Sequence, residues 1–504
     1  MNMVDALDRG VLFHPDREAV VCGEKRFTYK ELGAAVTQMA LGLKFLGVAE
    51  GDRICLYLHN RPEFLIALYG ALKIGAVCVS LSPMIKADEV ESLVNDCGAV
   101  VLITEKELGV NIPARELIPT VKTIVGIDGV ASNMDWETLL ADRADSLDTA
   151  NLSPDAPATM IYTSGTTGKS KGVVLSHGNL VSNTNAAKYM CGVKGEDRSI
   201  CFLPMSHSFA QNFISNSTIQ AGGCIVILKA FEMKSALETM AKERITRFYA
   251  VPPIYILLME TPEAVKALES VTYCFSAASS LPGEVAKKWK ERFGLTINEA
   301  YGLSETSPFA TYNHEIRHKV GSVGTPIMNV ELRIMDPEDN EVPLGEMGEI
   351  QIRGPNVMLG YFGKPEETAE VMVEGGWLRT GDVGYIDKEG YLFLADRIKD
   401  MINNAGLKVW PRQVEEVIYC HPLVRECAVI GVPHDVYGET VMAVVSLVEP
   451  DGVSGEEIRL MVKEKLSDYK VPRVVKFVDD LPKNATGKIL KRELRAMELA
   501  GKEK

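Results

Sequence analysis

Patterns typical of strands and of helices alternate along this chain to about residue 300, and this alternation constrains its fold more than any other feature. Residues 28–31, Thr-Tyr-Lys-Glu, form a capping box before apolar residues that recur at helical spacing as far as Gly47. Residues 53–58 then have the pattern of a buried strand, residues 62–74 that of a helix, and residues 76–80 that of the next strand. Because strands that alternate with helices usually pair in parallel, we predict parallel sheets with helices on their faces.

The pattern changes in the last third of the chain. From about Val320 to Tyr391 it consists of short strands separated by Gly, Pro and Asp, which is typical of a small antiparallel β subdomain. A new compact unit begins after Lys399. Its expected elements are a helix at 411–420, strands at 427–432 and 440–448, and an amphipathic helix at 455–468.

These patterns predict an α/β protein of two domains. Residues 1–398 form a large N-terminal domain of helix-covered parallel sheets plus the small β subdomain. Residues 399–504 form a small, mobile α+β C-terminal domain. A chain of 504 residues is in any case too long for a single compact core.

Composition narrows the possible functions. A formal charge of −14 argues against nucleic acid as a partner, because binding to a phosphate backbone needs a basic surface. The N-terminus lacks the basic and apolar regions of a signal peptide, and no apolar run is long enough to span a membrane. Ten scattered cysteines without a Cys-x-x-Cys motif favour reduced thiols over a disulfide framework or a zinc site. We therefore expect a cytoplasmic protein, as a monomer or homodimer.

A loop rich in glycine, hydroxyl groups and lysine follows the apolar stretch 159–161. It reads Tyr-Thr-Ser-Gly-Thr-Thr-Gly-Lys-Ser-Lys-Gly from Tyr162 to Gly172. Glycines let the backbone approach an anion, hydroxyls donate hydrogen bonds, and lysines bring positive charge, so the run predicts a phosphate-binding loop. It is not a Walker loop, because that motif needs glycine where this chain has Thr163.

This loop resembles the signature of the adenylate-forming superfamily, which includes acyl-CoA synthetases, luciferases and adenylation domains. The resemblance extends, in the expected order, over essentially the whole chain. Four further segments carry it: Tyr301–Thr306, Thr380–Asp382, Asp396–Asp400 and Pro482–Ile489.

The resemblance implies an AMP-forming acyl-CoA synthetase that uses ATP, Mg²⁺ and coenzyme A. A carboxylic acid would attack the α-phosphate of ATP to give an acyl adenylate and pyrophosphate, and the thiol of coenzyme A would then displace AMP. Lys488 would bridge the acid and the α-phosphate, while Glu305 and Thr163 would hold Mg²⁺. The residues implied to bind the nucleotide are Thr163, Ser164, Gly165, Thr166, Thr167, Gly168 and Lys169 at the phosphates, Tyr301 and Gly302 at the adenine, Ser304 at the α-phosphate, and Asp382 and Arg397 at the ribose.

The second half-reaction is implied to need a different arrangement of the two domains. Lys399 would act as the hinge, and its rotation would replace Lys488 with residues 403–408. Gly406 would line the tunnel for the thiol arm because it has no side chain. Lys408 stands where many relatives carry asparagine or glutamine, so it would either contact a phosphate of coenzyme A or face water.

The acid itself is constrained by residues 204–212, which resemble the acyl-pocket motif with His207 as a wall beside the carboxylate. No Asp, Glu, Lys or Arg occurs from Leu203 to Leu228, which favours an acid with an uncharged tail. The small residues 277–282 form the other expected wall and leave room. A fatty acid is the first candidate, and a medium-chain, alicyclic or aromatic acid is the alternative. A helix over 209–220 would place Phe209, Phe213, Asn216 and Gln220 on one face.

Three other functions share parts of this pattern. A ligase that loads a carrier protein would have the same motifs, as would an oxidative light-emitting enzyme. A nucleotide-binding regulator without catalysis belongs to another class. Lys488, Glu305 and Asp382 argue against the regulator, since all three implied reactive positions are present.

Overall fold

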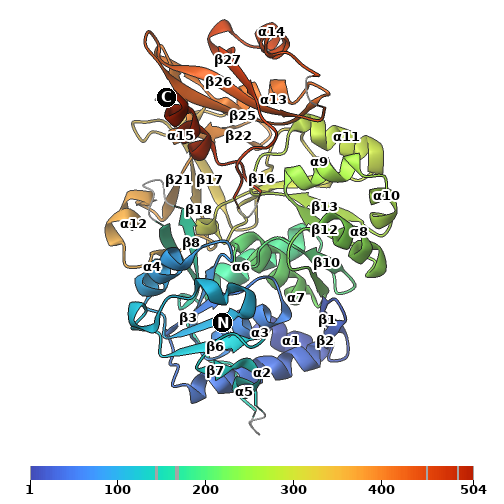
Figure 1. Cartoon of the computed structure of the whole chain (residues 1–504), viewed down its shortest axis with the longest axis vertical. Coiled ribbons are helices and arrows are strands. Elements are labelled where there is room, and N and C mark those ends of the chain that lie inside the picture. Colours follow the sequence, from blue (N-terminus) through green and yellow to red (C-terminus); the bar gives the residue numbers. More distant parts are fainter. Residues whose placement is uncertain (1, 142–145, 165–169, 450–451, 485–486, 503–504) are drawn as a thin grey trace.

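The computed structural model describes residues 2–141, 146–164, 170–449, 452–484 and 487–502. These residues form two large sheets, a small antiparallel sheet, and a separate unit at the C-terminal end that lies at the top of Figure 1. The α/β fold with a separate small C-terminal domain is confirmed. The position of the boundary between residues 398 and 399 stays a prediction.

The first large sheet has nine strands, six of which form its parallel centre. The edge strands β2, β15 and β16 pair in antiparallel fashion. In sheet order the strands are β16 (Thr325–Pro326), β15 (Thr311–Asn313), β14 (Ile297–Tyr301), β13 (Tyr273–Ser276), β12 (Arg247–Ala250), β10 (Arg198–Cys201), β11 (Cys224–Ile227), β1 (Glu18–Cys22) and β2 (Lys25–Thr28).

The second large sheet has eight strands, and the predicted phosphate loop lies between its strands β8 and β9, which pair in antiparallel fashion. The strands from β8 to β7 in sheet order are parallel. In order they are β19 (Gly360–Tyr361), β9 (Ser170–Ser176), β8 (Pro157–Ser164), β4 (Val77–Leu81), β3 (Arg53–Tyr57), β5 (Val101–Glu105), β6 (Thr123–Ile127) and β7 (Met134–Asp135).

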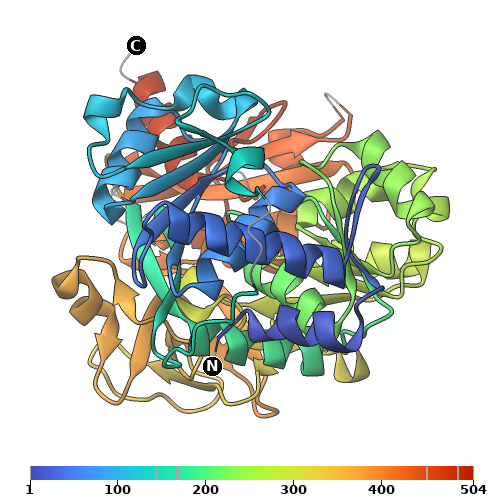
Figure 2. The ribbon, with the colours of Figure 1, turned by 90° about the horizontal axis from the view of Figure 1, so that it is seen from below.

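Helices cover both large sheets, as predicted from the alternating pattern. The capping box is present at the start of α2 (Tyr29–Phe45), where the Thr28 hydroxyl accepts a hydrogen bond from the amide of Glu31. Every residue of α3 (Pro62–Lys73) is buried, and its side chains belong to a core that contains strand residues of both sheets. With α1 (Asp5–Phe13), α2 lies on the face opposite the C-terminal unit, which is the face toward the viewer in Figure 2. Other helices that cover the sheets are α4 (Ala87–Cys97), α6 (His177–Met190), α8 (Met233–Lys242), α9 (Pro252–Glu260) and α11 (Gly283–Phe293).

The segment after His207 differs from its prediction. Phe209–Asn216 forms a π-helix, labelled η3, and only Ser217–Ala221 continues as the α-helix α7. A π turn holds more residues than an α turn, so the side chains are displaced around the axis. Asn216 accepts a buried hydrogen bond from the Tyr69 hydroxyl at 2.9 Å, whereas Gln220 accepts one from Arg9 at the surface. The prediction of one shared face was therefore wrong.

The predicted antiparallel β subdomain is confirmed as a third sheet. Its long central strand β21 carries the Thr-Gly-Asp turn, and β22 leads directly into the predicted hinge at Lys399. The strands are β17 (Glu331–Met335), β18 (Gly348–Arg353), β20 (Met372–Val373), β21 (Trp377–Ile386) and β22 (Leu392–Arg397).

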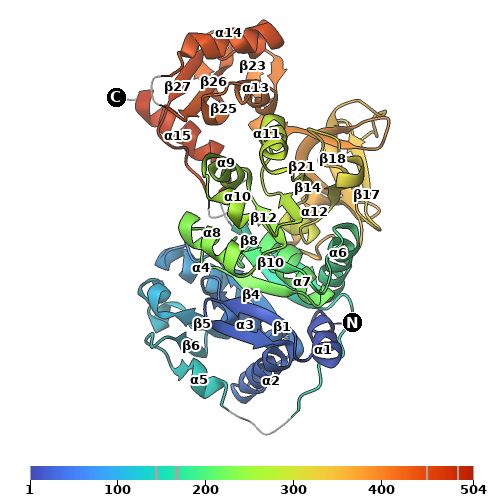
Figure 3. The ribbon, with the colours of Figure 1, turned by 90° about the vertical axis from the view of Figure 1, so that its right-hand side faces the viewer.

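The C-terminal unit has a sheet and a core of its own, at the top of Figure 3. Helices α13 and α14 pack against one core cluster of this sheet, and α15 contributes Leu494 to a second cluster. No helix among the described residues is long and apolar enough to cross a membrane. The elements are β23 (Ile402–Asn404), β24 (Leu407–Val409), β25 (Val424–His434), β26 (Gly438–Leu447), β27 (Val474–Phe477), α13 (Pro411–Ile418), α14 (Gly455–Lys465) and α15 (Lys491–Lys502).

Candidate active site

A cluster of three predicted nucleotide-binding residues lies where the first large sheet meets the β subdomain. Asp382 on β21 is paired in register with Arg397 on β22, and the Arg397 Nε lies 3.2 Å from the Asp382 Oδ1. The hydroxyl of Tyr301, at the end of β14, donates a hydrogen bond of 2.7 Å to the Asp382 Oδ2. Burial and the nearby Asp382 carboxylate raise the pKa of Tyr301 well above its usual value, so it stays a hydrogen-bond donor. The cluster thus presents an oriented carboxylate beside an aromatic ring.

The phosphate-loop hairpin is connected to Glu305 through one tyrosine. Thr163 on β8 is opposite Lys171 on β9, and the Lys171 Nζ lies 4.9 Å from the centre of the Tyr361 ring. The Tyr361 hydroxyl in turn donates a 3.0 Å hydrogen bond to Glu305 Oε1. The base of the loop and the predicted magnesium ligand therefore lie in one neighbourhood.

Glu305 fits a hard divalent cation. Burial raises the pKa of this carboxyl, while the hydrogen bond from Tyr361 lowers it. A bound cation would favour the ionised form, since Mg²⁺ prefers carboxylate, hydroxyl and phosphate oxygens. Glu305 and Thr163 would supply such oxygens from the protein.

The segment from Gly302 to Ser304 packs tightly against its neighbours. A Cβ atom at Gly302 would lie 1.6 Å from the backbone oxygen of Pro308, so only glycine fits there. The hydroxyl of Ser304 lies 3.4 Å from that of Ser208, the residue after His207. The acyl-pocket segment and the nucleotide segment are therefore adjacent.

Lys488 reaches this cluster from the C-terminal unit. The positive charges of Arg397 and Lys399 oppose its ammonium group, and the carboxylates of Asp382 and Asp400 favour it. Burial, which is the largest cause, and Arg397 lower the pKa of Lys488 to about 8.

His207 is neutral at physiological pH. Burial and the Lys488 charge lower the pKa of its imidazole to about 4. Its Nδ1 accepts a 3.2 Å hydrogen bond from the amide of Phe209, which fixes the ring at the start of the π-helix. A neutral ring beside Lys488 can form a wall or accept a hydrogen bond, but it does not compete for the anion as a cation.

Other predicted residues lie at the surface or outside the part of the chain that the structure describes. Gly406 and Lys408 are exposed on the β23–β24 hairpin, whose turn has positive φ angles at Ala405 and Gly406. Lys399 is exposed in the short turn after β22. Ser164 ends β8, and its side chain lies outside the part of the structure that can be described, as do Gly165, Thr166, Thr167, Gly168 and Lys169.

Two residues of this region had not been predicted. Tyr361 does not belong to any of the motifs found in the sequence. Only its hydrogen bond to Glu305 in the structure indicates a role. Glu299 lies two residues before Tyr301 on β14, and burial raises its pKa to about 8, although the C-terminal Arg412 opposes that shift. The signal that sequence analysis could have used for Glu299 is a carboxyl group in the middle of a short, buried strand.

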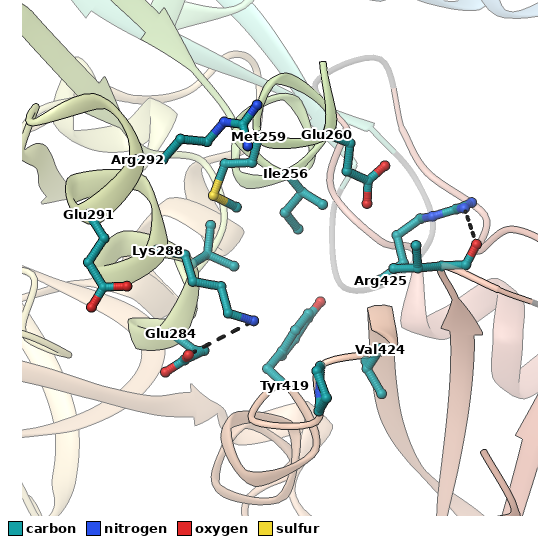
Figure 4. Close-up of a pocket in the computed structure, with 13 residues that line it drawn as sticks. Ile256, Met259, Glu260, Glu284, Lys288, Glu291, Arg292, Tyr419, Val424 and Arg425 are labelled. Carbon is teal, nitrogen blue, oxygen red and sulfur yellow. Dashed lines mark hydrogen bonds and ion pairs between the residues drawn. The ribbon is translucent and has the colours of Figure 1, made fainter. Parts of the chain in front are cut away.

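A further cavity lies elsewhere in the structure. It has a volume of about 460 Å³ and separates α9 and α11 from the C-terminal unit (Figure 4). Ile256 and Met259 lie across it from Tyr419 and Val424, and Val285 also lines it. None of the predicted site residues lines it, so it is a gap in the interface between the domains and not the candidate active site.

The fold and the cluster define a class of protein: one with a large α/β domain and a separate small C-terminal domain, whose partly buried Lys488 feels the charges of Asp382 and Arg397. The chain belongs to the AMP-binding enzyme family, whose model matches residues 7–362, and the model of the AMP-binding enzyme C-terminal domain matches residues 413–488. The resemblance to the adenylate-forming superfamily is thereby confirmed, and the prediction of an AMP-forming acyl-CoA synthetase is confirmed at the level of the family.

The similarity to known relatives extends over nearly the whole chain. A feruloyl-CoA synthase from Amycolatopsis sp is 34% identical over 491 residues, which cover 95% of this chain and 96% of the relative. A long-chain-fatty-acid–CoA ligase from Bacillus subtilis (strain 168) is also 34% identical, over 95% of this chain and 91% of the relative. The crystal structure of an anthranilate CoA ligase in complex with anthranoyl-AMP superimposes with a TM-score of 0.94 at 28% identity, covering 100% of this chain and 98% of that one.

Proposed function

We propose that this chain is an acid–CoA ligase that activates a carboxylic acid with an uncharged tail as its adenylate and transfers the acyl group to coenzyme A. The observation that carries this proposal is the partial burial of Lys488 within the influence of the Asp382 and Arg397 charges, which form an ion pair of 3.2 Å. This supports a role for a cation of the C-terminal domain at the proposed ribose site of the larger domain. Relatives whose names specify CoA ligation support the choice of acceptor.

In the first half-reaction, a carboxylate oxygen of the acid attacks the α-phosphorus of ATP, and pyrophosphate leaves. Asp382 accepts hydrogen bonds from the ribose hydroxyls, with its orientation fixed by Tyr301 and Arg397. The charged Lys488 holds the attacking carboxylate beside the α-phosphate and stabilises the negative charge that grows there. Neutral His207 lies beside the carboxylate and keeps water from it.

Mg²⁺, when bound, neutralises phosphate charge and polarises the phosphoryl oxygens. Glu305 and Thr163 are its proposed protein ligands. Tyr361 would hold the Glu305 carboxylate in place through its hydrogen bond. The residues Ser164 to Lys169 complete the proposed phosphate site together with Ser304 at the α-phosphate.

In the second half-reaction, the sulfur of coenzyme A attacks the acyl carbon, the bond to AMP breaks, and AMP leaves. We assign residues 1–398 and 399–504 to two domains that rotate about Lys399 between the half-reactions. The exposed hairpin that carries Gly406 and Lys408 then replaces Lys488 at the site. Glycine at the hairpin turn has a positive φ of 86°, which most other residues avoid.

The side chains that follow His207 indicate which class of acid the site would accept. A fatty acid is the first candidate because no charged residue occurs from Leu203 to Leu228. A specific observation favours a compact aromatic, alicyclic or medium-chain acid as the second candidate. The buried rings of Phe209, Phe213, Phe275 and Phe309 pack with centroids 4.5 to 6.4 Å apart. We propose that these rings form the end of the acyl site beneath His207.

The proposal is tested by measuring pyrophosphate and AMP release with Mg-ATP and coenzyme A. The acids run from acetate to palmitate and include benzoate, ferulate and cyclohexanecarboxylate. Turnover that needs coenzyme A and peaks at one acid supports the proposal and identifies the pocket. Pyrophosphate release without consumption of coenzyme A would indicate a carrier-protein ligase, and the absence of release with every acid would contradict the proposal.

A further inference from the structure

The segment that carries Lys488 is fixed on both sides within the C-terminal unit. On its N-terminal side, the Lys483 Nζ forms an ion pair of 2.7 Å with Glu426 of β25. On its C-terminal side, the Lys491 Nζ lies 2.9 Å from Glu415 of α13. Between them the Asn484 side chain accepts a hydrogen bond of 2.9 Å from the Lys488 amide. The described residues on either side of Lys488 are therefore tied to their own domain.

Lys491 also reaches across the predicted domain boundary. Its Nζ lies 3.4 Å from the Asp396 Oδ2, and the side chains of Lys491 and Asp396 are only 18% and 12% exposed. The same oxygen accepts a 3.1 Å hydrogen bond from the backbone amide of Arg412 at the start of α13. The carboxylates of Glu415 and Asp396 raise the pKa of Lys491, so the ammonium stays charged.

Asp396 occupies a particular place in the chain. It lies three residues before Lys399 and directly before Arg397, which pairs with Asp382. Glu415, the second partner of Lys491, lies after Lys399. A rotation of the backbone at Lys399 moves Lys491 together with Glu415 but separates it from Asp396.

Another part of this interface is loosely packed. The cavity of about 460 Å³ separates α9 and α11 from Tyr419 and Val424, so those surfaces are not in close contact there. The amide of Gly283, at the start of α11, is 3.5 Å from the Glu416 Oε2, which is a long hydrogen bond. The partly buried contacts of Asp396 therefore help to hold the domains in this arrangement.

We propose that Asp396 and Lys491 are positioning residues that hold Lys488 at the nucleotide for adenylate formation and separate when the domain rotates for thiolysis. This inference rests on the proposed function, because it assigns the observed arrangement to the first of its two half-reactions. Under this proposal, the two carboxylates that contact the Lys491 ammonium group have different roles. Asp396 acts only in the first arrangement, whereas Glu415 acts in both.

The test compares the half-reactions in the full-length chain. Adenylate formation is followed as pyrophosphate release with octanoate and Mg-ATP, or with the best acid of the panel. Thiolysis is followed as consumption of the synthetic adenylate of that acid by coenzyme A. We expect Asp396→Asn to lower the rate of adenylate formation about tenfold, the loss typical of one charged hydrogen bond, and to leave thiolysis within about twofold.

Two matched variants separate positioning from stability. Glu415→Gln removes the other partner of Lys491 and is expected to lower both half-reactions. Glu498→Gln lies on the same helix α15 but pairs with Lys476 of β27, and it is expected to change neither. If Asp396→Asn lowered both half-reactions equally, as Glu415→Gln does, the inference would be overturned.

A measurement without catalysis separates this inference from the proposed function. Spin labels at Lys266→Cys and Val436→Cys, both exposed positions, in a Cys420→Ser background report the distance between the domains. We expect Asp396→Asn to broaden that distance distribution in the absence of substrates and Glu498→Gln to leave it unchanged. An unchanged distribution in Asp396→Asn would contradict the inference even if no acid were ever activated.

Discussion

The hydroxyl of Tyr301 donates a 2.7 Å hydrogen bond to Asp382, although the two residues lie 81 positions apart in the chain. One end of a strand in the first large sheet is thereby tied to the β subdomain. Because Arg397 binds the other carboxylate oxygen at 3.2 Å, the orientation of Asp382 is determined before any ligand arrives. Such preorganisation is what a ribose site needs.

Removing this hydroxyl is expected to weaken use of ATP. We predict that Tyr301→Phe lowers kcat/KM for ATP about fivefold, since one neutral-to-charged hydrogen bond of roughly 1 kcal/mol is lost while the ring remains. Asp382→Asn removes the charge itself and is expected to cost at least tenfold more. Both are measured by ATP–pyrophosphate exchange at varied ATP. Equal effects of the two variants would show that the hydroxyl does not act through Asp382.

The pH dependence of adenylate formation is expected to follow Lys488. Its pKa is lowered to about 8, so the ammonium is charged below that pH and loses its proton above it. Only the charged form stabilises the growing phosphate charge, and kcat/KM for ATP should therefore fall above about pH 8. His207, with a pKa of about 4, should contribute no change between pH 5.5 and 7.5.

Lys488→Arg provides the control for this pH dependence. A guanidinium stays charged throughout the accessible range, so the decline above pH 8 should disappear, although the different shape lowers the rate about a hundredfold. A decline of the same midpoint in the arginine variant would assign the titration to another group. Exchange rates from pH 6 to 9.5 distinguish these outcomes.

Glu299 is expected to destabilise the folded chain at neutral pH. Its folded pKa of about 8 lies above the value of 4.5 for an ordinary glutamate, so folding requires a proton that the unfolded chain releases above pH 4.5. The stability is therefore full below that pH and declines as the pH rises toward 8. Glu299→Gln should unfold at a higher temperature at pH 7.5, corresponding to a gain on the order of 4 kcal/mol, and should match the wild type near pH 4.5. Exposed Glu260→Gln serves as the control, and a gain independent of pH would contradict the prediction.

The sequence predicted those parts of the site that are encoded by contiguous motifs. Tyr301, Ser304 and Glu305 lie on one short segment, and Asp382 meets Arg397 through a hairpin, so local patterns were sufficient. The alternation of strands and helices similarly predicted β3, α3 and β4 to within one or two residues. Predictions succeeded where neighbours in space are also neighbours in the chain.

Contacts between distant segments could not be predicted in this way. Tyr361 and Glu305 are 56 positions apart in the chain, and Lys491 and Asp396 are 95 positions apart. No repeated spacing in the sequence predicts either pair. The prediction for residues 209–220 was wrong for a related reason. Two of its buried side-chain amides donate to partners elsewhere: Asn212 to the Ser307 carbonyl oxygen at 2.5 Å and Gln211 to the Ser80 hydroxyl at 2.7 Å. Such distant partners favour the π-helix over the α-helix that the local sequence predicts.

The length of acid that the site accepts is expected to depend on Phe213. This residue is six positions after His207, and its ring stacks on Phe275 with centroids 4.5 Å apart and meets Phe309 at 4.9 Å. Replacing it with alanine opens space where an acyl tail would otherwise end. We predict that Phe213→Ala raises kcat/KM for a longer acid relative to a shorter one about tenfold, the gain expected from burying roughly two more methylene groups.

The loss of stability must be separated from this change in specificity. Phe213→Ala is expected to cost about 3–5 kcal/mol, and Phe213→Leu less, so the leucine variant serves if the first does not fold. Phe248→Ala provides the matched control, because that buried ring packs against Phe202 and Tyr255, not against the cluster beneath His207. It should lower stability without moving the preferred acid. Since relatives include ligases for both ferulate and long-chain fatty acids, an unchanged profile in both Phe213 variants would place the end of the acyl site at another wall.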